Sequence, residues 1–204
     1  IRFAVVRLGL LGTRRRHLAR GGPIVDSFPL GENLGLAQVG GERRQIKSGF
    51  GRFAGVVGAY NGLITWGKKY KSYDLKPAHL CVDYAELKQE LKKLKLPNIK
   101  IILTGNGRVS LGALELLKEA GIKQVTAADI LTKVYAEPVF AELLTENLYE
   151  RIDGKPYDRS DFHHDPTRYR CVFRYYLPNC DMLINGIYWD VKMDRLFSEN
   201  DTRM

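Results

Sequence analysis

The sequence has few cysteines and no C-x-x-C pair. Its three cysteines are Cys81, Cys171 and Cys180. An odd number of widely spaced cysteines is not a disulfide framework or a zinc ribbon, so a reduced, cytoplasmic setting is expected. The chain also lacks a run of about 18 apolar residues, so no membrane span is expected. Its arginine cluster follows the first apolar residues, which is not the order of a signal peptide.

The chain is basic, with a net charge of +9, but the excess lies at its start. Residues 1–48 hold nine of the 32 Lys and Arg residues and only three of the 23 Asp and Glu residues. The run Thr13–Arg20 is of a kind that can bind polyanions. Because the remainder is nearly balanced, a solvated basic run is the preferred interpretation, and nucleic acid is not expected as a partner.

A strand, a glycine turn and a helix follow one another in the middle of the chain. The apolar run Ile99–Leu103 predicts a strand that is buried on both faces. Gly105, Asn106 and Gly107 predict a tight turn, and an apolar face beginning at Val109 predicts a helix. Strand, glycine turn and helix in this order open a dinucleotide-binding βαβ unit.

The turn has the chemistry of a pyrophosphate site. Gly105 permits a sharp turn, and Gly107 lets phosphates approach the backbone N–H groups at the helix N-terminus. Arg108 lies where a guanidinium can reach a phosphate. The third glycine of G-x-G-x-x-G is replaced by Ser110, and Gly112 is the candidate for the close helix–strand contact. An ordinary glycine-rich βα turn is the alternative.

An acidic residue about 20 positions after the glycines holds the ribose hydroxyls in NAD-binding units. Asp129 has this spacing, and Glu137 is a weaker candidate. A carboxylate there favours NAD over NADP, because it repels the 2′-phosphate. However, Thr126–Asp129 is also a capping box for a helix over Ile130–Tyr135. Both interpretations stay open.

A second buried strand is predicted within Asp181–Trp189, and Asn185 and Gly186 lie at its end. The carboxyl ends of parallel strands face the cofactor crevice. Asn185 and Gly186 are therefore further candidates for the site.

A polar stretch, residues 150–170, contains a cluster of possible metal ligands, Asp161, His163, His164 and Asp165. Adjacent histidines point in different directions in either regular structure, and no i, i+4 partner completes a site. A surface loop is the preferred interpretation, and no metal is expected.

A long helix with several glycines is predicted from Gly49 to Tyr70. Gly51, Gly55 and Gly62 lie along it, and glycine lowers helix propensity by about 1 kcal/mol relative to alanine. A packing reason is therefore expected, such as another backbone that approaches closely. We predict a buried helix at a domain junction.

Three segments together resemble the NAD-dependent, lysine-forming saccharopine dehydrogenases, which are related to alanine dehydrogenase and the transhydrogenase nucleotide domain. They are GRFAGVVGAYNG at Gly51–Gly62, LTGNGRVSLGA at Leu103–Ala113 and DMLINGIY at Asp181–Tyr188. The resemblance covers about residues 47–197. It implies two Rossmann-like domains with the active site in the cleft between them. The cofactor-binding residues that it implies are Gly105, Asn106, Gly107, Arg108, Val109, Asp129, Asn185, Gly186 and Ile187.

The resemblance further implies hydride transfer between NAD(H), with NADP possible, and an amino-acid or imine substrate, as in lysine metabolism. The family's catalytic Lys and His belong to its N-terminal domain, and neither has a matching position in this sequence. The expected fold is therefore α/β, a Rossmann-like parallel sheet with flanking helices that is incomplete, since a full doubly wound sheet has about six strands. We expect an unassigned segment (residues 1–45), an interdomain helix and connector (46–80) and a truncated dinucleotide-binding domain (81–204). Such a partial chain is expected to bind cofactor without turning over substrate.

Two other classes remain. A methyltransferase that binds S-adenosylmethionine also has a Rossmann-like sheet, but it usually carries an acidic residue just before the glycine turn, where this chain has Thr104. A non-catalytic binding module would use the basic start of the chain. A P-loop NTPase is excluded, because no G-K-[ST] follows the glycines.

Overall fold

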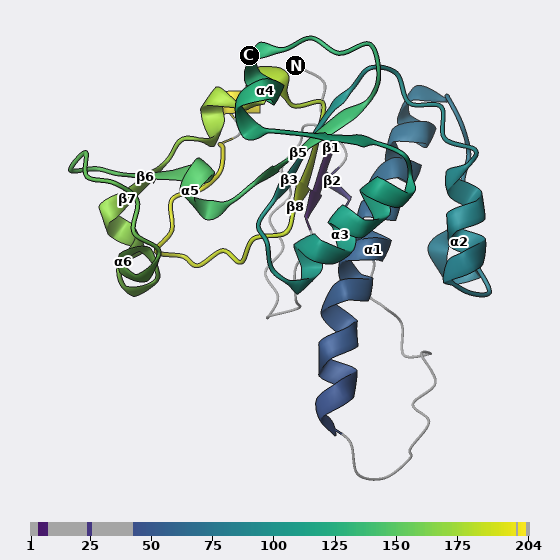
Figure 1. Cartoon of the computed structure of the whole chain (residues 1–204), viewed down its shortest axis with the longest axis horizontal. Helices are drawn as coiled ribbons and strands as arrows, with labels where there is room; N and C mark the ends of the chain where they lie inside the picture. The colour runs from purple at the N-terminus through teal and green to yellow at the C-terminus, as the bar shows by residue number, and fades with distance from the viewer. Residues whose placement is uncertain (1–3, 8–23, 26–42, 199, 203–204) are drawn as a thin grey trace.

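The computed structural model describes residues 4–7, 24–25, 43–198 and 200–202, with side chains from Phe50 onward. Its centre is a six-stranded parallel sheet with the strand order β2-β1-β8-β3-β5-β4 (Figure 1). The strands of this sheet are β1 (Ala4–Arg7), β2 (Ile24–Val25), β3 (Lys100–Thr104), β4 (Lys123–Val125), β5 (Val139–Leu143) and β8 (Met182–Asn185). A separate antiparallel pair consists of β6 (Tyr149–Arg151) and β7 (Tyr169–Cys171).

Helices connect the strands. They are α1 (Arg43–Tyr70), α2 (Tyr84–Leu91), α3 (Arg108–Glu119), α4 (Ala127–Thr132), α5 (Thr145–Leu148) and α6 (Arg159–His164). Short 3-10 turns occur at Ala78–Leu80, Pro166–Arg168, Phe173–Tyr175, Leu177–Asn179 and Asn200–Thr202. None of the described helices has the length and apolar character needed to cross a membrane.

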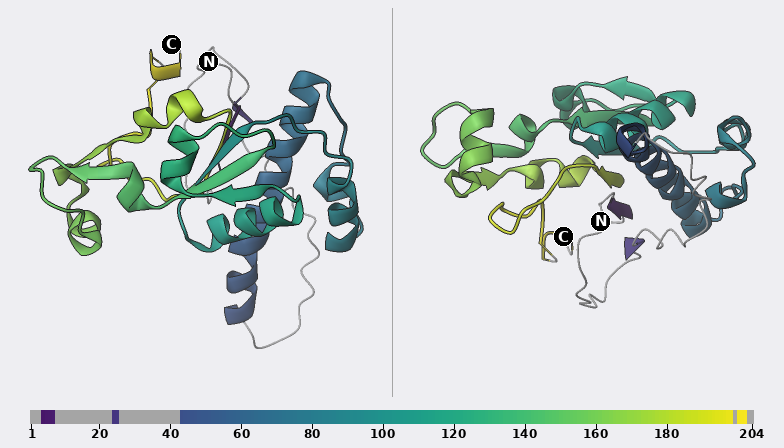
Figure 2. Two further views of the ribbon diagram at one scale, coloured as in Figure 1. Left: turned by 45° about the horizontal axis from the view of Figure 1, so that its top comes forward. Right: turned by 90° about the horizontal axis from the view of Figure 1, so that it is seen from below.

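The sheet is buried on both faces. Successive side chains of a strand point to opposite faces, so Ile101 and Leu103 of β3 pack with α1, α2 and α3, whereas Ile102 packs with α4 and the residues that follow β5. The helix pair β6–β7 and α6 belongs to the second layer and extends away from the sheet (Figure 2). The predicted α/β class, a parallel sheet between layers of helices, is confirmed.

Two strands of the sheet come from the first 45 residues, to which the sequence assigned no structure. β1 pairs in parallel with β8 over four residues, and β2 pairs with β1 over two. Strands this short have too few residues to display a hydrophobic period, so their pairing partner defines them. The basic run Thr13–Arg20 lies outside the described residues.

The glycines of α1 have the packing role that the sequence predicted. A Cβ added to Gly55 would lie 1.8 Å from the carbonyl oxygen of Val109, and one added to Gly112 of α3 would lie 1.9 Å from the carbonyl oxygen of Arg52. The backbones of α1 and α3 therefore touch at two reciprocal points. The Arg52 guanidinium also donates to both carboxylate oxygens of Glu115 on α3, at 2.7 and 2.5 Å. This hydrogen bonding lowers the pKa of the Glu115 carboxyl.

Candidate functional site

The strand order has a switch point between β3 and β8. The chain leaves β3 through α3 toward β4 and β5 on one side, whereas β8 and β1 lie on the other side of β3. β3 and β8 are paired up to Thr104 and Asn185, their last residues. In open parallel sheets, ligands bind in the crevice beyond the carboxyl ends of the strands at such a point. The glycine turn and the Asn185–Gly186 segment both begin there.

The first glycine of the turn cannot be another residue without strain. Gly105 has a φ of +87°, and an added Cβ would lie 2.9 Å from Cγ2 of Ile187. Its amide N–H donates to the carbonyl of Leu143, the last residue of β5, at 2.8 Å. Gly105 therefore turns the chain sharply while it stays bonded to the neighbouring strand.

The two predicted segments meet at the carboxyl edge. The Thr104 hydroxyl donates to Oδ1 of Asn185 at 2.6 Å, and the amide N–H of Gly186 donates to the Thr104 carbonyl at 3.2 Å. The amide N–H of Ile187 donates to the same Oδ1 of Asn185 at 3.4 Å. The chain that leaves β8 is thereby held beside the glycine turn.

Ser110, at the third glycine position, makes the close helix–strand contact. Its fully buried hydroxyl lies 3.0 Å from the Thr104 carbonyl oxygen and 3.3 Å from that of Gly186. A Cβ at Gly186 would lie 2.3 Å from the Ser110 Oγ, so this glycine is needed for the approach. The prediction that Gly112 serves this contact was wrong, because Gly112 faces α1 instead.

The N-terminus of α3 opens onto free space. Gly107 is its N-cap residue, with a φ of −76° and no side-chain cap. No described atom lies within 4 Å of the position that a Cβ on Gly107 would take. Asn106, Gly107 and Arg108 are exposed, and Val109 is half-buried. The first backbone N–H groups of a helix have no partner within the helix, and together with the helix dipole they attract anions.

Asp129 lies in the first turn of α4. Its amide N–H donates to the Thr126 hydroxyl at 3.0 Å, and its carboxylate pairs with Lys133 at 3.0 Å. The next residue, Ile130, accepts a hydrogen bond from Nζ of Lys100, the first residue of β3, at 2.7 Å. α4 thus lies toward the amino end of β3, and the glycine turn follows the opposite end (Figure 1). This geometry matches the capping interpretation.

Two carboxylates that sequence counting did not single out lie near the carboxyl end of β5, which is the neighbour of β3 on that side. Glu142 pairs with Leu103 in register and lies within the strand, where burial raises the pKa of its carboxyl. Glu146, in the first turn of α5, is exposed just beyond the strand end. The signal that could have found it is the order of the strands in space, which a sequence does not display.

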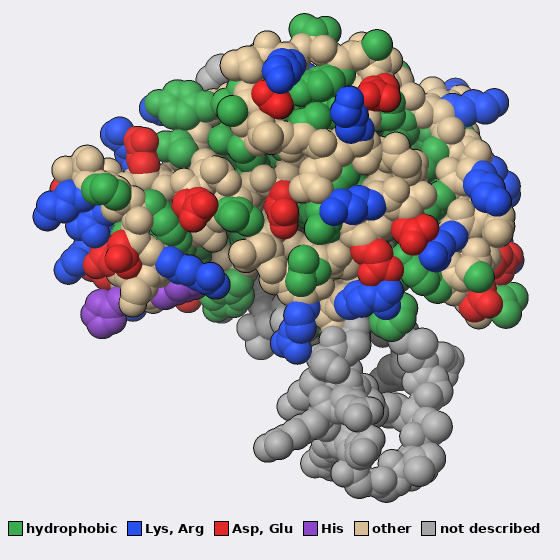
Figure 3. Space-filling model, in the orientation of Figure 1, with side chains coloured by type: hydrophobic (Ala, Val, Ile, Leu, Met, Phe, Trp, Pro, Cys, Tyr) green, Lys and Arg blue, Asp and Glu red, His purple; other side chains and the backbone are tan. Residues whose placement is uncertain are grey.

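The cluster Asp161, His163, His164 and Asp165 is a surface feature of α6 and the turn after it. Asp161 pairs with Arg151 and Arg168, and Asp165 accepts from the amide and hydroxyl of Thr167. In Figure 3, histidine side chains lie on the surface over α6, among side chains of both charges. Within the described part of the chain, no three His, Cys, Asp or Glu side chains are grouped to hold a metal ion.

Three curated proteins show what the chain is similar to, whereas no family model matches it. It is 31% identical to the mitochondrial alpha-aminoadipic semialdehyde synthase of Rattus norvegicus over 114 residues, which are 52% of this chain and 12% of that protein. The Mus musculus protein of the same name is 27% identical over 184 residues, 76% of this chain and 19% of the relative. The Bos taurus protein is 31% identical over 114 residues. The chain therefore spans less than a fifth of the length of these relatives.

Proposed function

We propose that this chain carries the dinucleotide-binding part of a nicotinamide-dependent oxidoreductase that transfers hydride between NAD(H) and an amino-acid or imine substrate. One observation carries the proposal: an open glycine turn at a helix N-terminus, located at the switch point of a parallel sheet. The sequence resemblance to saccharopine dehydrogenases supports the reaction class. The similarity to proteins named as synthases of an amino-acid semialdehyde supports the substrate class.

The residues at the carboxyl edge fit the cofactor. Gly107 leaves room for a pyrophosphate, which the N–H groups of the first turn of α3 and the Arg108 guanidinium would bind. Asn185, Gly186 and Ile187 would line the nicotinamide side, where Thr104 and Ser110 fix their backbone. The nicotinamide, when bound, supplies the hydride chemistry, and the protein supplies orientation and exclusion of water.

The methyltransferase alternative has weaker support. The residue before the glycine turn, Thr104, donates its hydroxyl to Asn185 and offers no carboxylate to a ligand. A non-catalytic module that binds through the basic start of the chain would depend on residues 8–23, most of whose charge lies in the run Thr13–Arg20.

Titration of the purified chain with NAD, NADH, NADPH and S-adenosylmethionine tests the proposal. We expect saturable binding of a nicotinamide nucleotide in calorimetry. At about 100 times Kd it should stabilise the fold by about 2.7 kcal/mol, because a ligand that binds only the folded state shifts the unfolding equilibrium. S-adenosylmethionine should give no shift in Tm. Binding of S-adenosylmethionine alone, or of none of the four by a folded chain, would contradict the proposal.

We further propose that Glu146, rather than Asp129, contacts the adenosine ribose. β5 lies next to β3, so its carboxyl end occupies the place of the ribose-binding acid. Glu146→Arg is expected to shift preference from NADH toward NADPH by about tenfold or more, because it replaces a charge that repels the 2′-phosphate with one that attracts it. Asp129→Arg is the matched control and should leave the ratio of the two Kd values unchanged. The opposite pattern would restore Asp129 as the ribose partner.

A further inference from the structure

A second cavity lies at the amino end of the sheet, across β3 from the glycine turn. It has a volume of about 780 Å³ and is enclosed by the end of α1, by the residues after it, and by the segments that lead into β3 and β8. Ile99 and Asp181 stand directly before these two strands. Because β3 is five residues long, about 16 Å of strand separates this cavity from the candidate cofactor site.

Two polar side chains in the wall of this cavity have unpaired hydrogen-bonding groups. Trp66 is 5% exposed, and its indole Nε1 has no hydrogen-bond partner among the described residues. The Oγ of Ser72 is likewise buried without a partner. An indole N–H can only donate, and a buried donor without an acceptor is costly. The wall therefore offers donors to an acceptor that a ligand would bring.

The other end of the cavity is acidic. Asp181 accepts the amide N–H of Lys100 through Oδ2 at 2.8 Å, and no ion pair to Asp181 occurs among the described side chains. The ammonium of Lys100 bonds instead to Ile130 and Asn179. The Asp181 carboxylate thus keeps its negative charge uncompensated by a neighbouring cation.

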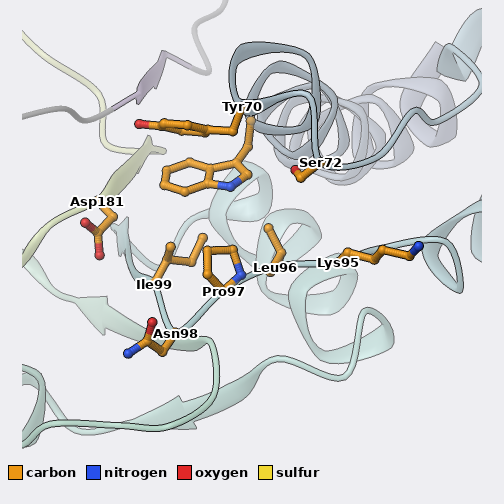
Figure 4. Close-up of a pocket in the computed structure, with 9 residues that line it drawn as sticks. Tyr70, Ser72, Lys95, Leu96, Pro97, Asn98, Ile99 and Asp181 are labelled. Carbon is orange, nitrogen blue, oxygen red and sulfur yellow. The ribbon is translucent and has the colours of Figure 1, made fainter.

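Apolar and aromatic groups lie between the two ends. Figure 4 shows Asp181 on one side, Ser72 and Lys95 on the other, and Ile99, Pro97 and Leu96 in between. The ring of Tyr70 lies 4.4 Å from that of Trp66, and aromatic faces attract cations as well as apolar chains. Lys95 extends outward but adds positive charge at the end of the cavity that carries Ser72.

From this arrangement we infer that the cavity binds an ω-amino carboxylate, a small molecule with an ammonium group and a carboxylate separated by an apolar chain. The ammonium lies at Asp181, the carbon chain packs along Ile99 and Pro97, and the carboxylate accepts from Trp66 and Ser72. The site is separate from the proposed cofactor site and does not depend on it.

Fluorescence of Trp66 provides the test. The chain has two tryptophans, so Trp189→Phe leaves Trp66 as the only reporter. We expect 6-aminohexanoate to change its emission with saturation. Hexylamine and hexanoate each lack one of the two charged groups and should bind about tenfold more weakly or worse, since each loses one charge-assisted contact.

Variants then locate the site. Asp181→Asn should weaken 6-aminohexanoate binding about tenfold, because it removes the charge but keeps an acceptor for the Lys100 amide. Ser72→Ala, which removes no existing hydrogen bond, should weaken it severalfold. Asp74→Asn removes an exposed carboxylate outside the cavity and should have no effect.

The inference is overturned if hexylamine or hexanoate binds as well as 6-aminohexanoate. It is also overturned if no probe binds to the folded chain, or if Ser72→Ala and Asp181→Asn bind as the parent does. Should Asp181→Asn not fold, Ser72→Ala alone decides. NADH titration of the same variants keeps the two proposals apart, since Asp181→Asn should bind NADH normally.

Discussion

Gly55→Ala is expected to destabilise the fold by about 3 kcal/mol, the upper end of the cost of overpacking. The added Cβ would meet two backbone atoms of α3, the Val109 oxygen at 1.8 Å and the Ala113 nitrogen at 2.8 Å. Backbone atoms cannot rotate away, so α1 and α3 must separate and expose fully buried side chains such as Tyr60 and Leu116. Urea denaturation followed by circular dichroism measures the change.

The sign of the change is diagnostic. Helix propensity alone favours alanine over glycine by about 1 kcal/mol, so an isolated α1 would be stabilised by the same substitution. Gly107→Ala is the matched control, because its Cβ meets nothing within 4 Å and its φ of −76° suits any residue. It should change stability by less than about 1 kcal/mol. If Gly55→Ala proves more stable than the parent chain, the two backbones do not touch as described.

The carboxyl edge of the sheet could be predicted because its signals are local. The apolar run before Gly105 and the one before Asn185 each predict a buried strand, and parallel strands bring their carboxyl ends to one edge. Glycines along α1 likewise predicted a close backbone contact. The sequence could not say that the contacting element is α3, because such contacts join residues more than 50 positions apart.

The ribose-binding acid shows where sequence counting fails. The spacing of about 20 residues assumes that the next strand along the chain is also the next strand in space. Here β4 comes first along the chain but lies at the edge, and β5 is the strand beside β3. Counting therefore indicates Asp129, in the connection between β4 and β5, whereas the topology directs attention to Glu146. Ser110 is a second case, since its hydroxyl bonds with the strand ends where a glycine was expected.

Gly107→Val is expected to weaken NADH binding about 100-fold or more while the protein remains folded, because two methyl groups would occupy the space in front of the α3 N-terminus. The backbone at Gly107 has a φ of −76° and a ψ of 176°, which valine adopts readily. Loss of glycine at an N-cap costs only about 1 kcal/mol, so the Tm should fall by a few degrees. Calorimetry with NADH and a thermal melt of the same sample measure both quantities.

Position 107 is a sharper test than position 105. Gly105 has a φ of +87° and almost touches Ile187, so a substitution there would disturb the fold together with the site. At Gly107 the two effects separate, because nothing in the described chain occupies the space that valine would fill. Unchanged NADH affinity in Gly107→Val would mean that the nucleotide binds elsewhere and that this glycine turn only connects β3 to α3. Loss of NADH binding with retained 6-aminohexanoate binding would place the nucleotide at the carboxyl edge and leave the amino-end cavity an independent site.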